Sequence, residues 1–560
     1  MKFQTAASLL ALGHLAVSQS TNSSSATLSG PIANITNGTI IGKYVAEYDQ
    51  DQFLGIPFAQ PPVGGLRFNL PQAVNETWEQ PLNATEYGPI CVNYPLGLPL
   101  DPLDITYAQS EDCLTLNVVR PAGIDPNRRL PVLVYIFGGG FQEGGSADGR
   151  YNTSYMVRNS VDMDQPTIMV TINYRLAGWG FLAGEAFKNE GLLNLAIQDQ
   201  RLALRWIQEN IEAFGGDKSR VTIQGESAGA ISIGYHMLAY DGRDDGLFSA
   251  AICQSGGPWF FGTYPSSEAQ ETTYQAMLNA TNCTTAIDSV ACLRAAPFDV
   301  LNATIASLSF LPVVDGGLVP SYNSIALKKG NFVKVPLLIG TNTNEGTLFA
   351  GSGVNTSKEF RSFVQYAGYV GVNNNKTIDL VVDAYPLLPE DNVTLPAPYG
   401  AQFVRAARYT GDAMFIAGRR YTCELWTSYG VPCYSYRFDT LPADTPPVTF
   451  GAAHFEDVAF VFNNVIGTGM DASAFNVTSP LRERYVALSN VMSRMWVSFA
   501  GTHDPNNHRV DNFTTHWPLY ALDEPQNIVL NGSSGVYIEA DDFRKAPMKL
   551  LIDSALSYSR

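Results

Sequence analysis

Ser227 lies in a short stretch whose residues could carry out nucleophilic chemistry. The stretch reads Arg220-Val-Thr-Ile-Gln-Gly-Glu-Ser-Ala-Gly-Ala230. Its β-branched residues predict a strand, and the residues after Ala230 are compatible with a helix. Gly225 and Gly229 leave room for the close backbone approach of a strained turn, which would hold the serine hydroxyl clear of the sheet. The pattern alone predicts either a catalytic serine or an ordinary turn rich in Gly and Ser.

Backbone amides near this turn could stabilise the oxyanion of an acyl transfer. The helix after Ser227 would direct its free N–H groups and the positive end of its dipole toward the serine. A second glycine-rich segment, Gly138-Gly-Gly-Phe-Gln-Glu-Gly-Gly145, follows the apolar run 130–137. Successive glycines expose their own N–H groups, so this loop predicts the other half of an oxyanion hole, although it would also fit an ordinary loop.

A serine nucleophile needs a base, and His454 is the candidate among the six histidines of the chain. It lies in a glycine-containing loop before an apolar run. His236 follows on the helix after Ser227 and would point away from it. The remaining histidines lie in the N-terminal leader or in polar late segments where we expect surface positions: His14, His503, His508 and His516. With an ordinary pKa, a histidine base would make activity fall as the pH drops through roughly 6 to 7.

The base in turn needs a carboxylate to orient it, and Glu345 is the candidate. It follows directly after the strand-like run 335–340, where a carboxylate at the end of a strand would belong. Glu456 and Asp457 are too close to His454 in sequence for the usual chain order of serine, acid and histidine.

The elements that must position these residues alternate between apolar strands and helical stretches. Apolar runs predict buried strands at 130–137, 167–174, 250–254 and 335–340, besides the strand before Ser227. Helical spacing covers 195–214 and stops at Gly215-Gly216. This alternation is typical of an α/β fold with a large, mostly parallel central sheet that has helices on both faces and functional sites at the carboxyl ends of its strands.

Composition limits the partners of the chain. Its 560 residues are 45% hydrophobic, which supports a large core, and its formal net charge is −17. Phosphate binding needs a basic footprint, so nucleic acid and anionic membrane surfaces are disfavoured. The spacing of Cys and His residues indicates no metal site, and we expect no cofactor.

The N-terminus and the glycosylation motifs predict secretion. Residues 1–18 combine one lysine, an apolar run and Ala16-Val-Ser18, which is typical of a signal peptide and too short to be a membrane anchor. Fifteen Asn-x-Ser/Thr motifs, from Asn22 to Asn531, predict N-linked glycans. We expect a flexible segment at 19–38 and a single catalytic domain at 39–560. The oligomeric state is left open.

The seven cysteines predict two disulfides and one buried thiol. Two pairs flank short loops and would close them: Cys91 with Cys113, and Cys283 with Cys292. Cys253 lies in an apolar strand and is expected to be a buried free thiol. Cys423 and Cys433 either pair or both belong to the core.

Taken together, these motifs resemble the type-B carboxylesterase family, which includes fungal lipases, carboxylesterases and cholinesterases. The resemblance covers roughly residues 40 to 555 and is carried by seven motifs in the family's order: Glu111-Asp-Cys-Leu-Thr-Leu-Asn-Val118, Phe137-Gly-Gly-Gly-Phe141, Asn173-Tyr-Arg175, the run 199–217, Gly225-Glu-Ser-Ala-Gly-Ala230, Asn344-Glu-Gly346 and Gly451-Ala-Ala-His454. It implies an α/β-hydrolase fold and a secreted serine carboxylic ester hydrolase that works through an acyl-enzyme on a small ester substrate.

The resemblance also assigns roles to individual residues. Ser227 would be the nucleophile, His454 the base and Glu345 the orienting acid. The oxyanion donors would be the N–H groups of Gly139, Gly140 and Ala228. Ser255 would lie beside the acid and base, and Glu226 would be a buried carboxylate beside the nucleophile. The pairs Cys91–Cys113 and Cys283–Cys292 match the family's common disulfides.

Departures from the family concern the substrate. The loop 91–113 has no Trp to face a quaternary ammonium group, which disfavours choline esters, and no long amphipathic flap of the fungal lipase kind. That loop either covers the site or packs on the core. Trp259-Phe-Phe261 either lines an acyl pocket or belongs to the core. A triacylglycerol lipase is the first alternative function, and a non-catalytic adhesion protein on the same scaffold is the second.

Overall fold

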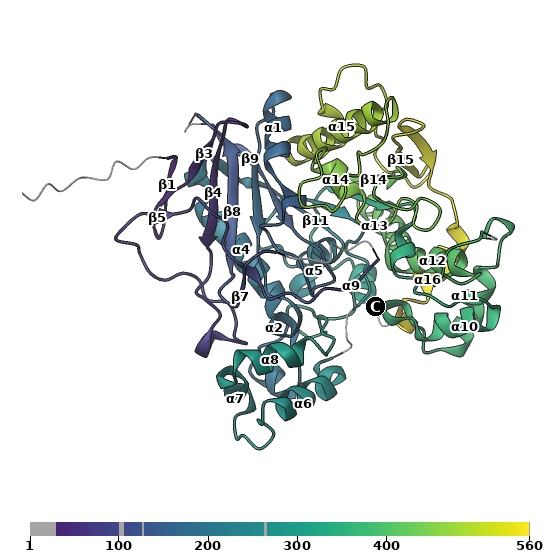
Figure 1. Cartoon of the computed structure of the whole chain (residues 1–560), viewed down its shortest axis with the longest axis horizontal. Coiled ribbons are helices and arrows are strands. Elements are labelled where there is room, and N and C mark those ends of the chain that lie inside the picture. The colour runs from purple at the N-terminus through teal and green to yellow at the C-terminus, as the bar shows by residue number, and fades with distance from the viewer. Residues whose placement is uncertain (1–29, 100–105, 126–127, 263–265, 392, 559) are drawn as a thin grey trace, which may run out of the picture.

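A long twisted sheet forms the centre of the molecule (Figure 1). The computed structural model describes residues 30–560 except 100–105, 126–127, 263–265, 392 and 559. Within these residues the sheet has 11 strands in the order β16-β15-β14-β13-β12-β11-β9-β10-β8-β4-β3.

The strands from β15 to β10 are parallel to one another. In sheet order they are β15 (Gln526–Leu530), β14 (Cys433–Phe438), β13 (Leu337–Asn342), β12 (Ala250–Gln254), β11 (Gly216–Glu226), β9 (Leu130–Ile136) and β10 (Ile168–Ile172). Every residue of β9, β10, β12 and β13 is buried, as their continuous apolar runs predicted. Antiparallel strands flank them: β8 (Thr115–Pro121), β4 (Gln50–Pro57), β3 (Lys43–Val45) and β16 (Tyr537–Ala540).

Helices cover both faces of the sheet, as expected for an α/β-hydrolase fold. The helices that pack on its central part are α1 (Ser154–Asp162), α4 (Leu195–Asn210), α5 (Ala228–Gly242), α13 (Ala417–Ser428) and α15 (Leu481–Thr502), and α14 (Asp457–Val461) packs on α15. The predicted helix 195–214 ends as α4 at Asn210, and a 3-10 turn continues to Phe214.

Ten further helices complete the described chain, several of them at the lower and right margins of Figure 1. They are α2 (Ala177–Phe181), α3 (Glu185–Asn189), α6 (Glu271–Ala280), α7 (Ser289–Ala295), α8 (Phe298–Ile305), α9 (Asn323–Lys329), α10 (Ser357–Tyr366), α11 (Asn375–Ala384), α12 (Phe403–Gly411) and α16 (Lys545–Asp553). A π-helical turn, Asp412–Ile416, joins α12 to α13.

The prediction of a flexible segment at 19–38 is wrong for the last residues of that range. Strand β1 (Ile32–Ile35) pairs antiparallel with β2 (Gly38–Ile41), and β2 pairs with β5 (Leu82–Asn83). The segment is ordered here because Ala33 and Ile40 are buried, which the polar composition of the preceding residues concealed. Two further short strands, β6 (Ile90–Cys91) and β7 (Gln109–Ser110), pair with each other. Residues 1–29 lie outside the described part, and so does the expected signal peptide.

Three disulfides stabilise the described chain. Two join the predicted pairs, Cys91–Cys113 and Cys283–Cys292. The third joins Cys423 on α13 to Cys433 on β14, which decides the alternative that the sequence left open. Cys253 is a buried free thiol, as predicted.

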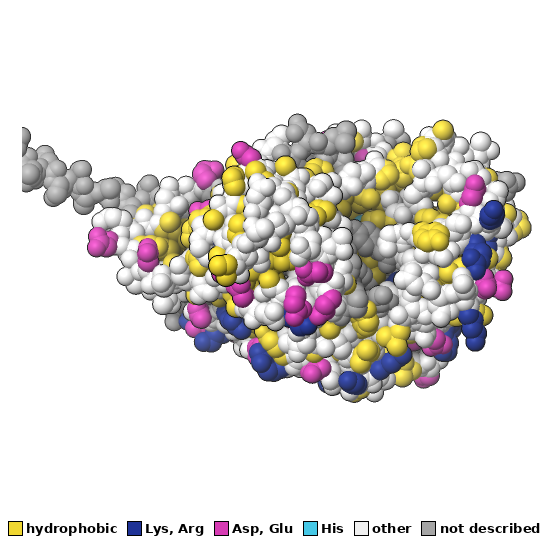
Figure 2. Space-filling view, turned by 90° about the horizontal axis from the view of Figure 1, so that it is seen from below, with side chains coloured by type: hydrophobic (Ala, Val, Ile, Leu, Met, Phe, Trp, Pro, Cys, Tyr) yellow, Lys and Arg dark blue, Asp and Glu magenta, His cyan; other side chains and the backbone are white. Residues whose placement is uncertain are grey.

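The surface is mixed in charge on the face seen in Figure 2, where acidic and basic side chains alternate along the lower margin. Among the described residues, no helix combines the length and the apolar character that crossing a membrane requires.

Candidate active site

Ser227 occupies a strained turn between β11 and α5. Its φ of 54° and ψ of −124° are unfavourable for a residue with a side chain. The turn is possible because its flanking glycines touch other backbone: a Cβ on Gly229 would lie 2.0 Å from the Ile136 oxygen, and a Cβ on Gly225 would lie 2.5 Å from the Gly229 carbonyl carbon. Ser227 is partly exposed whereas Glu226 and Ala228 are buried, so the turn presents the serine alone.

Amide groups from two segments surround the serine. Ala228 is the first residue of α5, so its N–H has no partner within the helix. Gly139 and Gly140 lie in the loop after β9 with φ of 89° and 60°. Neither of their amides donates a hydrogen bond to another residue of the described chain. All three residues line the same cavity as Ser227. The geometry therefore leaves three backbone donors available next to the hydroxyl.

Glu345 and His454 meet at the carboxyl end of β13, although 109 positions separate them in sequence. His454 Nδ1 lies 2.6 Å from Glu345 Oε2. The other carboxylate oxygen, Oε1, accepts hydrogen bonds from the Ser255 hydroxyl at 2.6 Å and from the Asn342 amide at 2.7 Å. With both oxygens bonded, the carboxylate is fixed, and it holds the imidazole with Nε2 directed away from it.

The loop that carries His454 is fastened to the loop that carries Glu345. Asn342 Nδ2 donates to the Ala453 oxygen at 2.5 Å, and the Asn344 amide donates to the Ala452 oxygen at 2.9 Å. Asn344 Oδ1 in turn accepts from the Ala452 amide at 3.0 Å. Asn342, the last residue of β13, and Asn344, just after it, therefore hold Ala452 and Ala453 in place and with them the position of His454.

Glu226 is a buried carboxylate beside both Ser227 and His454. It is 0% exposed, and its Oε1 lies 3.2 Å from His454 Nε2. Neither carboxylate oxygen has a hydrogen-bond partner in the described residues. Burial raises the pKa of Glu226 to about 8. Glu226 thus adds a poorly solvated acid to the centre.

Glu226 and Glu345 also change the pKa of the His454 imidazole. Burial alone would lower the pKa of His454, but the charges of Glu226 and Glu345 outweigh it and raise the pKa to about 9. The value differs from the ordinary pKa that the sequence analysis assumed, because the sequence does not reveal how close Glu226 lies. The Ser227 hydroxyl makes no hydrogen bond within the described chain, and Nε2 faces Glu226 in this resting arrangement.

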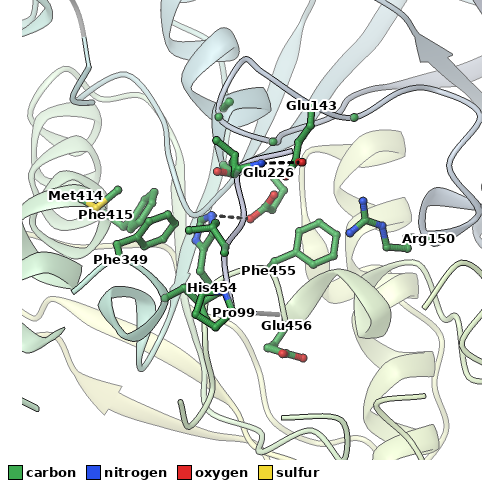
Figure 3. A pocket seen from close by; sticks show the side chains of 18 of the residues that line it. Pro99, Glu143, Arg150, Glu226, Phe349, Met414, Phe415, His454, Phe455 and Glu456 are labelled. Carbon is green, nitrogen blue, oxygen red and sulfur yellow. Dashed lines mark hydrogen bonds and ion pairs between the residues drawn. The ribbon is translucent and has the colours of Figure 1, made fainter. Parts of the chain in front are cut away.

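A cavity of about 520 Å³ contains these groups (Figure 3). Leu96, Leu98 and Pro99 line it, so the described part of the loop 91–113 forms a wall of the site; Leu100 and Leu103 lie outside the described residues. Phe261 also lines the cavity, whereas Trp259 and Phe260 are buried in the core, so the predicted aromatic segment is divided between the two roles.

The other histidines lie elsewhere. His236 is buried on α5 with its Nε2 2.8 Å from Gln200 Oε1. His503 is partly exposed and His516 is exposed, in line with the expected surface positions. His508 is only 8% exposed because its ring packs against Phe513 within its polar loop. The prediction of a surface position is therefore wrong for His508.

Several residues of the site carry no clear signal in the sequence. Met414 and Phe415, on the π-helical turn, line the cavity, and the Phe415 ring stacks on His454 at 4.5 Å. Arg150, Asp444 and Glu456 line it as well. A short π-helical turn is frequent at functional sites, but only the backbone reveals it.

Comparisons with known proteins agree with this geometry. A profile of the carboxylesterase family matches residues 29–542. Lipase 2 of Diutina rugosa is 32% identical over an alignment that covers 95% of this chain and 98% of the relative. Secreted lipase 1 of Botryotinia fuckeliana is 31% identical, with 95% and 93% covered.

Solved structures with the same fold include two esterases. EstA of Aspergillus niger superposes with a TM-score of 0.81 at 29% identity, covering 95% of this chain and 99% of that one. A PNB esterase superposes with a TM-score of 0.75 at 28% identity, covering 93% and 99%. The family, its esterase fold and the matching motifs lead to one conclusion. The chain belongs to the carboxylesterase family and is a carboxylic ester hydrolase.

Proposed function

We propose that this ester hydrolase works through a Ser227-His454-Glu345 triad and an acyl-enzyme intermediate. The observation that carries the proposal is the bonded set Ser255–Glu345–His454, which ends in the same cavity as the strained Ser227. A nucleophile, a base and an orienting acid in one cavity are the requirement for serine acyl transfer.

In the proposed mechanism His454 moves the proton. Glu345 accepts the hydrogen bond from Nδ1–H, so Nε2 of the neutral ring carries the lone pair. Nε2 takes the proton of Ser227 as the hydroxyl attacks the ester carbonyl, and then donates it to the departing alcohol. Water enters, Nε2 takes one of its protons as the water oxygen adds to the acyl carbonyl, and Nε2 then returns the proton to Ser227 Oγ as the bond to the acyl group breaks and the acid is released.

The oxyanion of each tetrahedral intermediate is assigned to the amides of Gly139, Gly140 and Ala228. These donors are fixed before the substrate arrives, so they stabilise the developing charge with little reorganisation. Loss of one such donor commonly lowers kcat by about 10²- to 10³-fold.

Replacement of Ser227 tests the triad. We expect Ser227→Ala to lower kcat for p-nitrophenyl butyrate by about 10⁴- to 10⁶-fold and to abolish labelling by a fluorescent organophosphonate. Ser428→Ala, a change of the same size at an exposed position on α13, should retain both. Hydrolysis near the wild-type rate in Ser227→Ala would exclude the mechanism.

Triacylglycerol hydrolysis is a second candidate, because several similar proteins are named lipases and one side of the cavity is apolar. A lipase of this kind would be recognised by a sharp rise in the rate on tributyrin once the substrate exceeds its solubility. A rate that already saturates at tributyrin concentrations below the solubility limit favours an esterase.

Secretion is part of the proposal. The signal-like residues 1–18, the three disulfides and the similarity to proteins named secreted lipases support it. We expect protein recovered from the culture medium to begin at Gln19 and to lose mass when N-glycans are removed enzymatically. Protein that stays inside the cell with Met1 retained would contradict this.

A further inference from the structure

The cavity has two chemically different sides (Figure 3). Phe349, Met414 and Phe415 lie on one side of His454, while Phe455, Arg150 and Glu456 lie on the other. Ile231, Leu311, Leu348 and Asp471 also line the cavity. The polar side also includes Asp444 and Thr445, which lie beside Glu456. An ester that fills both sides must therefore itself be apolar at one end and polar at the other.

Two carboxyl groups on the polar side are poorly satisfied. Glu456 accepts a hydrogen bond from the Thr445 hydroxyl. The neighbouring Asp444 has its Oδ1 buried without a partner in the described residues. Burial, together with the charge of the nearby Asp444, raises the pKa of Glu456 to about 8; burial also raises the pKa of Asp444. Near neutral pH the pair therefore retains a proton, and it offers both a donor and acceptors.

Arg150 adds a further donor. Its Nε and Nη2 donate to Asp148 at 2.9 and 2.7 Å, whereas Nη1 has no hydrogen-bond partner in the described chain. Its guanidinium lies 4.9 Å from the centre of the Phe455 ring. The aromatic face that could receive an external cation is thus already occupied by an internal one.

From these contacts we infer that the polar side, formed by Arg150, Asp444, Thr445 and Glu456, binds free hydroxyl groups on the alcohol part of the substrate. The preferred esters would be partial esters of polyhydroxy alcohols, with a hydrocarbon acyl chain on the apolar side. The inference rests on the proposed triad, which lies between the two sides.

A hydroxyl group fits this end better than a charged group does. An ammonium group would meet the guanidinium of Arg150 and an occupied Phe455 face. A carboxylate would meet Asp444 and Glu456. A hydroxyl donates and accepts at the same time, as the carboxyl pair and Arg150 require. A site built to bond a hydroxyl leaves buried polar atoms unpaired when the hydroxyl is missing, so selection against the deoxy analogue should be strong.

Matched substrates test the inference. Glyceryl 1-monobutyrate and propyl butyrate share the acyl group, and hence the acyl-enzyme, but differ by two hydroxyls on the alcohol. We expect wild-type kcat/KM to favour the glyceryl ester by about tenfold or more, since two neutral hydrogen bonds contribute that much. Glu456→Met should reduce the ratio to within about twofold, and Glu456→Gln, which still forms hydrogen bonds, should keep most of it.

The ratio of kcat/KM for the two esters separates recognition from structural damage. A disturbed fold slows the hydrolysis of both esters and leaves this ratio unchanged. Glu79→Met, an exposed position, serves as the matched control. If Glu456→Met does not fold, Asp444→Leu, which likewise removes a carboxyl group of the pair, replaces it.

Three results would overturn the inference while leaving the triad intact. The first is equal Ser227-dependent rates on glyceryl monobutyrate and propyl butyrate, and the second is a larger preference for butyrylcholine than for the glyceryl ester. The third is a preference for methyl 4-hydroxybutyrate over methyl butyrate that exceeds the preference for the glyceryl ester over propyl butyrate. Absence of organophosphonate labelling and of any ester hydrolysis would instead reject the proposed function.

Discussion

The two halves of the proposed catalytic centre are built in different ways. The Ser227 half depends on backbone sterics: its turn exists because Gly225 and Gly229 touch other main chain. The half that contains Glu345 and His454 depends on side-chain hydrogen bonds between segments that are far apart in sequence. The first half is rigid and local, and the second is assembled by the tertiary fold.

This difference predicts how each half fails. A change to the serine turn meets backbone that cannot move, so the loss should be abrupt. A change to the histidine side removes one of several hydrogen bonds, so the loss should be partial. A change of charge near the imidazole should leave the geometry and alter only its protonation.

Among changes that keep all three triad residues, Gly229→Ala should lower activity most. The new Cβ would lie 2.0 Å from the Ile136 oxygen, so the turn cannot close without moving β9 or α5. We expect activity on p-nitrophenyl butyrate to fall by more than about 10²-fold, because small displacements of the nucleophile have that cost. Gly65→Ala, where the new Cβ would meet nothing within 4 Å, should retain activity and melting temperature. A fully active Gly229→Ala enzyme would show that the serine half is not sterically fixed.

Asn344→Ala should have an intermediate effect. It removes the hydrogen bond from the Ala452 amide to Asn344 Oδ1 but keeps the backbone bond between the same residues. We expect kcat to fall by about 10- to 100-fold and stability to fall by about 1–3 kcal/mol, measured by urea unfolding. Asn331→Ala, which removes an exposed hydrogen bond to Asp241, is the control. Unchanged kcat with reduced stability would mean that the fastening does not position His454.

Glu226→Gln should have the smallest effect on rate and a clear effect on pH dependence. The neutral imidazole is the active form, so kcat/KM rises with pH toward the His454 pKa of about 9. Removing the Glu226 charge should move this inflection toward roughly 6.5, the ordinary histidine value. The same raised pKa stabilises the fold below about pH 6.5, and this contribution is lost as the pH rises through about 9.

The pH profile of kcat/KM checks this directly, with Asp383→Asn as an exposed control. An inflection that does not move in Glu226→Gln would mean that another group sets it.

The parallel strands and the serine turn were predictable because their signals are local. Continuous apolar runs gave β9, β10, β12 and β13 close to their observed bounds, and two glycines around a serine gave the turn. Strand β1, the edge strand β16 and the π-helical turn were not predicted, because short strands and irregular helices depend on what covers them. The burial of His508 was missed for the same reason.

The residues that face one another across the cavity could not be read from spacing. Neither the proximity of Glu226 to His454 nor the meeting of Arg150, Asp444 and Glu456 follows from sequence, because loops far apart in the chain bring them together.

The sequence by itself determined the parallel strands and the serine turn, since these depend on local sterics and apolar periodicity. The tertiary structure alone decided the pKa of His454, the third disulfide and the division of the cavity into apolar and polar sides. Those properties depend on distances between segments, which the fold sets and the order of residues does not express.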